Sequence, residues 1–197
     1  MSISFKKALL EEYARVAHAL SAPARLSILE QLAQGERGVE ALAEKTGLSL
    51  ANCSQHLQQL RRSSLVTSRR DGKAVIYQLS DAKILNLMDF LRIVAERNLA
   101  QVERILRGLS GDEDAPEPIS RADLAFRLAK GTVTVLDVRP ADEYAAAHIP
   151  GALNVTLAEL EQVLPKFAAD AEIVAYCRGP YCVYAHQAVA ALRQHGF

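Results

Sequence analysis

The segment SGDEDAPEPIS, from Ser110 to Ser120, most constrains the fold, because the residue patterns on its two sides differ. It contains four acidic residues, two prolines and a glycine, and Ile119 is its only large apolar residue. Such a segment cannot bury a core face and its prolines resist helix, so it predicts an exposed linker. We therefore expect one domain at residues 1–109, a linker at 110–119 and a second domain at 120–197.

Charge is divided unevenly between the two regions. Residues 1–110 carry 16 Lys and Arg against 11 Asp and Glu, whereas residues 111–197 carry 7 against 12. The net charge of the whole chain is zero only because these two imbalances cancel. A basic region suggests a polyanionic partner, and its densest basic patch lies at residues 61–73. The alternative interpretation of that patch is a solvated charged face.

The first region has helical periodicity. Apolar residues recur at three- and four-residue spacing in residues 5–20 and 23–34, and Ser21 is a plausible N-cap for the second helix. The elements expected next are helices at 39–45 and 50–62 around Thr46-Gly47, strands at 65–69 and 74–79 around Asp71-Gly72, and a helix at 81–109. Helix, turn, helix and charged hairpin in this order predict an α+β winged helix-turn-helix domain that is mostly α.

The second helix of this helix-turn-helix has an apolar face and a polar face. Amide and imidazole side chains on the polar face can pair with base edges in the major groove, and neighbouring Arg and Lys can contact phosphates. The candidate DNA-binding residues are Ser49, Asn52, Gln55, His56, Gln59, Arg61, Arg62, Arg69, Arg70 and Lys73. Each one alone is more typical of ordinary helix surface, but their combination with the turn and the basic hairpin favours binding to double-stranded DNA.

Residues 10–100 resemble the arsenical-repressor (ArsR) family of dimeric bacterial regulators. The features that carry the resemblance are the SSLV sequence and the residues Leu57, Leu60, Arg70, Gly72 and Tyr77. The resemblance implies a homodimer, formed through the first and last helices, that binds a palindromic operator and releases it on a chemical signal.

The metal ligands of that family are missing from this sequence. Its metal sensors often carry a Cys-x-Cys pair after the second helix, where this chain has Gly-Glu-Arg-Gly-Val at residues 35–39. Residues 81–109 contain no His or Cys, and soft metals need thiolate or imidazole ligands. We therefore predict no metal and no cofactor. Cys53 lies on the apolar face of its helix and is expected to be a small core residue.

Strands and helices alternate in the second region. The expected elements are helices at 121–130, 141–147, 158–167 and 183–195 and strands at 132–138, 152–155 and 172–176. The strand at 132–138 is a nearly continuous β-branched run, typical of a parallel strand covered on both faces. This order predicts an α/β domain with a parallel sheet.

Cys177 follows the last of these strands directly. Catalytic groups of α/β folds lie at the carboxyl ends of strands, and the loop from Cys177 to Cys182 leads into a helix N-terminus. Backbone N–H groups and the helix dipole at such a place favour a thiolate, which is the nucleophilic form. A buried structural cysteine at a strand end is the alternative.

Residues 120–197 resemble the rhodanese family. The motifs are LDVRPADEYAAAHIPGALNV and, downstream, the loop YCRGPYC. The resemblance implies that Cys177 is the nucleophile and carries a sulfane sulfur as a persulfide, cradled by backbone N–H groups from Arg178 to Val183. It further implies that Arg178, Asp137 and Arg139 belong to the catalytic site with Cys177, where Asp137 and Arg139 brace the loop. Glu143 and His148 are expected to hold the same neighbourhood together.

Three features refine this resemblance. A six-residue loop suits a sulfur atom, whereas related phosphatases and arsenate reductases use a loop one residue longer. Cys182 places a second thiol near Cys177, where it either resolves a persulfide or packs under the loop as a small apolar residue. Rhodanese domains usually continue with one more strand and helix after the position of Phe197, so we expect either that the second domain is shortened or that its sheet is completed in another way.

We predict from these features a transcriptional regulator whose rhodanese-like domain carries or senses sulfane sulfur. Its expected partners are operator DNA, a second copy of the chain, and a sulfane-sulfur donor or thiol acceptor. A cytoplasmic location is expected because no apolar run approaches 18 residues and three cysteines form no disulfide framework. The competing interpretation is a sulfurtransferase whose DNA-binding half serves for localisation or dimerisation. A metal or arsenical sensor is a third, but it lacks ligands.

Overall fold

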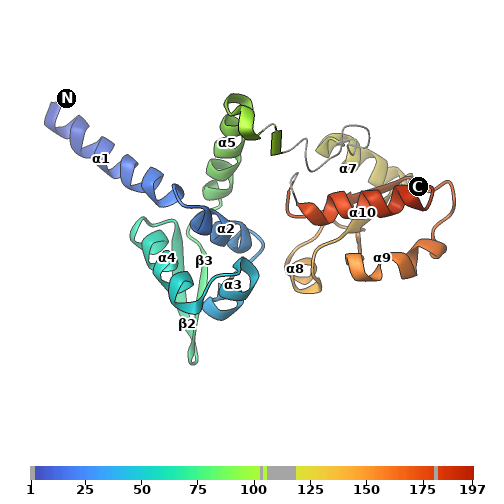
Figure 1. Ribbon diagram of the computed structural model, residues 1–197, viewed down its shortest axis with the longest axis horizontal. Helices are drawn as coiled ribbons and strands as arrows, with labels where there is room; N and C mark the ends of the chain where they lie inside the picture. Colours follow the sequence, from blue (N-terminus) through green and yellow to red (C-terminus); the bar gives the residue numbers. More distant parts are fainter. Residues whose placement is uncertain (1–2, 103, 106–118, 180–181) are drawn as a thin grey trace. The chain divides into compact units, whose positions relative to one another are not determined.

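The computed structural model of the chain describes residues 3–102, 104–105, 119–179 and 182–197 (Figure 1). It contains two compact units, Met1–Ile93 and Val94–Phe197, and the division between them falls inside helix α5 (Lys83–Asn98). The predicted linker at 110–119 lies outside the described residues except for its last residue. Each unit is described below by itself.

The first unit is a helix-turn-helix with a β-hairpin wing (Figure 1). Its elements before α5 are α1 (Ile3–Leu20), α2 (Pro23–Leu32), β1 (Arg37–Gly38), α3 (Val39–Thr46), α4 (Leu50–Arg62), β2 (Val66–Asp71) and β3 (Ala74–Leu79). The strands form an antiparallel sheet in the order β1-β3-β2. The short strand β1 was not expected from the sequence, since two residues give no alternation pattern to detect.

Local sequence signals fix the turn between α3 and α4. Gly47 ends α3 in the left-handed conformation with φ +67°, which glycine adopts without strain. The Ser49 side chain then accepts a hydrogen bond from the Asn52 amide and caps α4. The prediction for Ser21 is wrong: Pro23 sets the first turn of α2, so Ala22 occupies the N-cap position and the Ser21 hydroxyl donates to the His18 carbonyl oxygen.

One apolar cluster holds this unit together. Ile28, Leu29, Leu42 and Leu57, from α2, α3 and α4, are completely buried in it. Cys53 is buried in the same cluster, and burial raises the pKa of its thiol. A protonated thiol packed in a core is a poor nucleophile.

The predicted helix at 81–109 is interrupted. Helix α5 spans Lys83–Asn98, residue 99 is not helical, and residues 100–102 and 104–105 are helical again. Residues 103 and 106–109 lie outside the described part of the chain. The Asn98 side-chain amide donates to the Val94 carbonyl oxygen at 2.8 Å just before the interruption.

The second unit is built on a parallel sheet with the strand order β5-β4-β6. Its elements after α5 are α7 (Arg121–Lys130), β4 (Thr134–Asp137), α8 (Ala141–Ala146), β5 (Leu153–Asn154), α9 (Leu157–Val163), a 3-10 turn (Leu164–Lys166), β6 (Ile173–Tyr176) and α10 (Val183–Gln194). The predicted α/β class and parallel sheet are confirmed.

Side chains of the central strand β4 alternate between two apolar clusters. Leu136 packs with α9 and α10 on one face of the sheet, and Val135 packs with residues of α7 on the other. The register places Asp137 at the end of β4 directly between Asn154 of β5 and Tyr176 of β6. The carboxyl ends of all three strands therefore meet where Cys177 follows β6.

Candidate functional site

Helix α4 exposes only part of the polar face predicted from the sequence. Asn52 and Gln55 are exposed, whereas His56 and Gln59 are half-buried. The Gln59 side-chain oxygen accepts a hydrogen bond at 2.7 Å from Arg25 of α2. Gln59 is therefore held by the protein interior, and Asn52 and Gln55 are the better placed of the four to meet a base edge.

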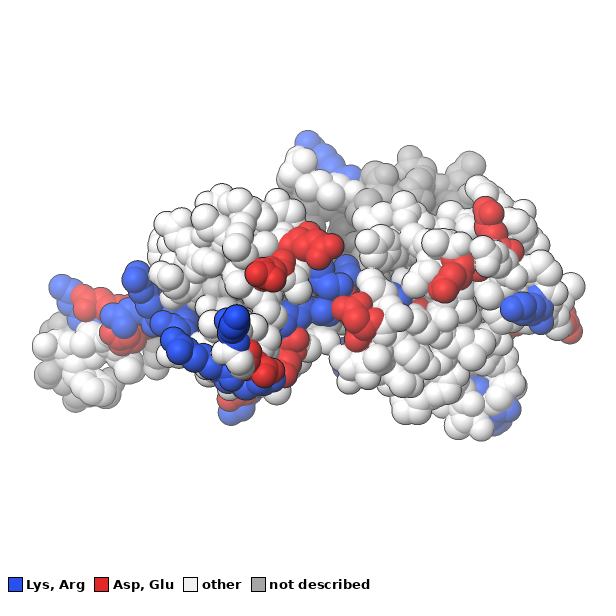
Figure 2. Space-filling view, turned by 90° about the horizontal axis from the view of Figure 1, so that it is seen from below, with Lys and Arg blue, Asp and Glu red and all other residues white. Residues whose placement is uncertain are grey.

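The basic side chains of the wing and of the end of α4 differ in whether they pair with a carboxylate. Arg69 pairs with Glu36 at 2.5 Å and with Asp71 at 3.2 Å, and hydrogen bonds to these carboxylates raise the pKa of its guanidinium. Arg62, Arg70 and Lys73 are exposed, and Arg61 donates to the Ser68 hydroxyl at 3.4 Å. Figure 2 shows blue and red side chains together at the wing, so the two carboxylates offset part of its positive charge.

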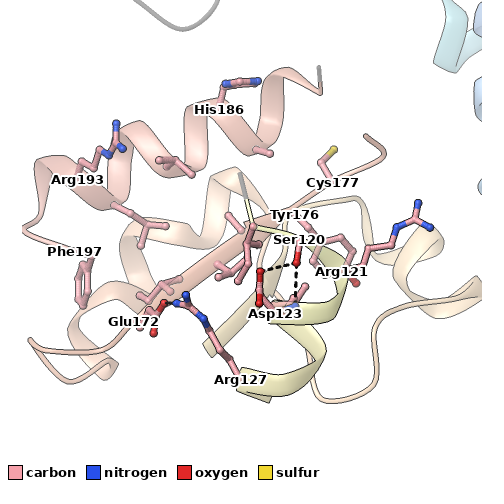
Figure 3. Close-up of a pocket in the computed structure, with 18 of the residues that line it drawn as sticks. Ser120, Arg121, Asp123, Arg127, Glu172, Tyr176, Cys177, His186, Arg193 and Phe197 are labelled. Atoms are coloured by element: carbon pink, nitrogen blue, oxygen red, sulfur yellow. Dashed lines mark hydrogen bonds and ion pairs between the residues drawn. The ribbon is translucent and has the colours of Figure 1, made fainter. Parts of the chain in front are cut away.

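A disulfide bond joins the two loop cysteines of the second unit. The sulfur atoms of Cys177 and Cys182 are bonded, and their Cα atoms lie 6.0 Å apart. Cys177 follows β6, and Cys182 is the N-cap residue of α10. The structure thus brings together the two cysteines that the sequence analysis had named as a pair. Figure 3 shows the Cys177 sulfur near the start of α10.

The expected cradle of backbone N–H groups is incomplete. The Cys182 amide donates to the Gly179 carbonyl oxygen at 3.1 Å, which closes the loop as a turn. That amide is therefore not directed at a sulfur on Cys177. Pro180 and Tyr181 lie outside the described residues.

Arg178 binds a carboxylate and does not face open solvent beside Cys177. Its guanidinium donates two hydrogen bonds to Glu143 of α8, at 2.7 and 2.9 Å, and lies 5.6 Å from the Tyr184 ring centroid. The Glu143 hydrogen bonds raise the pKa of Arg178, and the Glu143 side chain is completely buried. Arg178 therefore anchors the loop to α8, and its predicted catalytic role stays a prediction.

Asp137 and Arg139 form a second buried ion pair beside the loop. The Arg139 guanidinium binds the Asp137 carboxylate, with a shortest contact of 2.6 Å, and also donates to the Ala147 carbonyl oxygen. Burial alone would raise the pKa of Asp137, but hydrogen bonds from Arg139 and Tyr176 outweigh burial, so the pKa lies below its ordinary value. This pair fits the bracing role that the resemblance implied.

Tyr176 is a site residue that the sequence did not single out. Its hydroxyl donates to Asp137 at 2.6 Å and accepts from the Ile149 amide at 3.0 Å. Burial, together with the Asp137 hydrogen bond, raises its pKa to about 12. The one feature of the sequence that could have pointed to Tyr176 is its position at the end of a buried strand, because a buried tyrosine hydroxyl needs a hydrogen-bond partner. His148, in contrast, stacks on Tyr144 at the surface.

A cavity of about 730 Å³ opens beside Cys177 between α7, β6 and α10 (Figure 3). Its walls include the ion pair between Arg127 and Glu172 and the hydrogen bond between Ser120 and Asp123. Cys177 and Gly179 lie on the same wall as β6.

The described residues contain no group of three His, Cys, Asp or Glu side chains placed to hold a metal ion. No helix among them is long and apolar enough to cross a membrane.

Comparison with known proteins assigns a family to each half. The helix-turn-helix domain family matches residues 20–69, and the rhodanese-like domain family matches residues 120–197. The HTH-type transcriptional regulator Rv0324 of Mycobacterium tuberculosis is 45% identical over 192 residues, which cover 97% of this chain and 84% of that protein.

Other relatives match the first half. The nodulation protein NolR of Rhizobium meliloti is 42% identical over 73 residues, which cover 37% of this chain and 60% of that protein. The homodimeric winged helix-turn-helix domain of Mb0332 from Mycobacterium bovis, a possible ArsR-family regulator, is 41% identical, with a TM-score of 0.47 over 50% of this chain and 91% of that one. The near full-length match to Rv0324 and the two domain families place the chain among the ArsR-type winged helix-turn-helix transcriptional regulators that carry a C-terminal rhodanese-like domain.

Proposed function

We propose that this regulator binds a palindromic operator as a cytoplasmic homodimer and senses sulfane sulfur through Cys177. The observation that carries the proposal is the pairing of Cys177 with Cys182 at the end of β6. A thiol that can receive sulfur and a second thiol that can reach it are the two parts that a sulfur-responsive switch needs.

The DNA-binding part of the proposal rests on α4 and the wing. Asn52 and Gln55 are exposed on α4 and can meet base edges, which carry sequence information. Arg62, Arg70 and Lys73 are exposed beside them and can contact phosphates, which position the protein without reading sequence.

The homodimer is supported by exposed apolar side chains on α1 and α5. Phe5, Leu10 and Tyr13 are exposed on α1, and Phe90 and Leu91 on α5. Large apolar side chains gathered on helices mark association surfaces, and the related Mb0332 domain is homodimeric. The variant Phe90→Glu should therefore elute from a sizing column at the monomer volume, while wild type elutes as a dimer.

The proposed chemistry has two steps. The Cys177 thiolate attacks the outer sulfur of a persulfide or polysulfide, which forms a Cys177 persulfide and releases the donor's thiolate. The Cys182 thiolate then attacks the Cys177 sulfur, which forms the disulfide and releases hydrosulfide. The two cysteines are thereby oxidised and the sulfane sulfur is reduced. A cellular dithiol restores both thiols.

Intact-mass spectrometry of the full chain tests these steps. After reduction and exposure to sodium tetrasulfide, wild type should gain about 32 Da for a persulfide or lose about 2 Da for a disulfide. Cys182→Ser should keep the persulfide for longer, because its resolving thiol is gone. Cys177→Ser should show neither change.

Cys53→Ala is the matched control, because that thiol is buried in the other unit and should respond like wild type. A Cys177→Ser variant that still gained sulfur at Cys182 would show that the nucleophile is wrongly assigned. A wild type that showed neither mass change would contradict the sensing proposal as a whole.

A further inference from the structure

Arg25 is the buried cation of the first unit, and it connects three helices. It lies in the first turn of α2 and is 6% exposed. Its Nε donates to the Ala19 carbonyl oxygen at 2.5 Å and its Nη2 to the His18 carbonyl oxygen at 2.7 Å, while its Nη1 donates to Gln59 Oε1 at 2.7 Å. One side chain therefore joins the end of α1 and the C-terminal half of α4 to α2.

The contacts with α1 satisfy a helix terminus. The carbonyl groups of His18 and Ala19 belong to the last turn of α1, where helix carbonyls have no partner further along the helix. A guanidinium there also opposes the negative end of the helix dipole. Within the described part of the chain, the hydrogen-bond acceptors of Arg25 are all neutral oxygens.

The hydrogen bond from Arg25 to Gln59 holds a residue of α4, the helix proposed to face DNA. Gln59 stands on α4 one turn after Gln55, yet its oxygen points to Arg25 and its side chain is half-buried. A hydrogen bond from a charged donor to a half-buried amide is among the stronger polar contacts of a protein. It fixes the position of α4 relative to the α1–α2 junction.

We infer that Arg25 and Gln59 form a positioning pair that sets the orientation of α4 for sequence reading. This inference deepens the proposed function, since it rests on α4 being the reading helix. Because α1 is the proposed dimer helix, the pair also ties the orientation of α4 to the dimer interface. Loss of the pair should reduce the discrimination between DNA sequences and leave the phosphate contacts of the wing intact.

The test compares two DNA duplexes bound by the full chain. One is selected by the wild-type protein from a random-sequence library, and the other is its shuffled sequence. The measured quantity is the ratio of the two dissociation constants, with the salt dependence and the melting temperature of each variant beside it.

Gln59→Ala should lower this ratio about tenfold, as expected for loss of a hydrogen bond to a charged group. Arg25→Lys should lower it by a similar factor, since lysine lacks the planar fork that reaches three acceptors at once. The double variant should lose no more than either single variant, because both changes break the same contact. Gln59→Glu should keep the ratio, since its carboxylate still accepts from Arg25 and its repulsion of phosphates affects both duplexes alike.

Gln58→Ala is the matched control, because Gln58 is the exposed neighbour of Gln59 on the same helix and should leave the ratio unchanged. Additive losses in the double variant, or a Gln59→Glu variant as impaired as Gln59→Ala, would mean that Gln59 itself contacts DNA and would overturn the inference. A lower melting temperature with an unchanged ratio would overturn it as well. A Gln55→Ala variant that kept full discrimination would instead contradict the assignment of α4 as the reading helix.

Discussion

The ion pairs that border the two candidate sites of this chain differ in burial. In the first unit, ion pairs such as Arg69 with Glu36 lie at the surface, and about half of each side chain remains exposed. In the second unit, the pairs Asp137–Arg139 and Glu143–Arg178 have fully buried carboxylates and surround the loop that begins at Cys177. Both units are small and apolar at the centre, so the difference lies in where the charge is placed.

This difference indicates two kinds of function. Exposed charges act over distance and are weakened by salt, which suits attraction to a polyanion. Buried pairs are screened little and hold one geometry, since removal of one partner leaves an uncompensated charge in the interior. We therefore expect salt to change DNA binding by the first unit, and we expect acid or loss of one ion-pair partner to lower the stability of the second unit.

The largest effect is expected from Asp137→Asn. This change leaves Arg139 buried without its carboxylate, which should cost about 3–5 kcal/mol of stability in the second unit. Hydrogen exchange of the full chain, followed in peptides that cover β4 and β6, measures this loss. Glu172→Gln removes the surface pair with Arg127 and should cost no more than about 1 kcal/mol. Equal costs for the two variants would contradict the contrast between buried and surface pairs.

Acid should lower the stability of the second unit in the wild type, as Asp137→Asn does. The pKa of Asp137 is held below its ordinary value in the folded chain, so its contribution to stability is present above the unfolded value of about 3.9. That contribution is lost as the pH falls through the lowered folded value. Hydrogen exchange at β4, corrected for intrinsic rates, should fall in protection over this acid range in wild type and less in Asp137→Asn. Parallel pH profiles would rule out Asp137 as the titrating group.

A smaller effect is expected from Gln55→Ala in the first unit. Loss of one base contact should weaken binding to the selected duplex by about 1–3 kcal/mol and leave the shuffled duplex nearly unaffected. Fluorescence anisotropy with both duplexes measures this difference. If the shuffled duplex lost as much affinity, Gln55 would be a backbone contact.

The smallest effects concern the wing. Arg70→Ala should weaken binding to both duplexes alike and reduce the slope of log affinity against log salt by about 1. Arg69→Ala should change the slope less, because Glu36 and Asp71 already pair with that guanidinium. Titrations at several salt concentrations compare the two variants. A larger change for Arg69→Ala would mean that DNA displaces those carboxylates.

Features set by neighbouring residues could be predicted from the sequence. Gly47, the Ser49 cap and the hairpin after Asp71 depend on contacts within a few positions, and the structure has all three. The interruption of the predicted helix at residue 99 was missed, because the apolar spacing continues through it.

Contacts between distant residues could not be predicted in this way. Gln59 was predicted as a DNA contact and Arg178 as a catalytic group from their positions in motifs, and their hydrogen-bond partners were not predicted. Their partners, Arg25 and Glu143, are 34 and 35 positions away in the sequence. Residue type and spacing say nothing about such pairs, because they depend on how the helices pack.

Operator binding before and after sulfur treatment tests the central claim most directly. The affinity of the full chain for the selected duplex is measured with the reduced protein and again after sodium tetrasulfide, with excess reagent removed and the mass checked. Wild type should change its affinity by about tenfold, within the usual range of coupling between two sites, and Cys177→Ser should not change. A wild type that has formed the Cys177–Cys182 disulfide and binds the duplex as tightly as before would contradict the account.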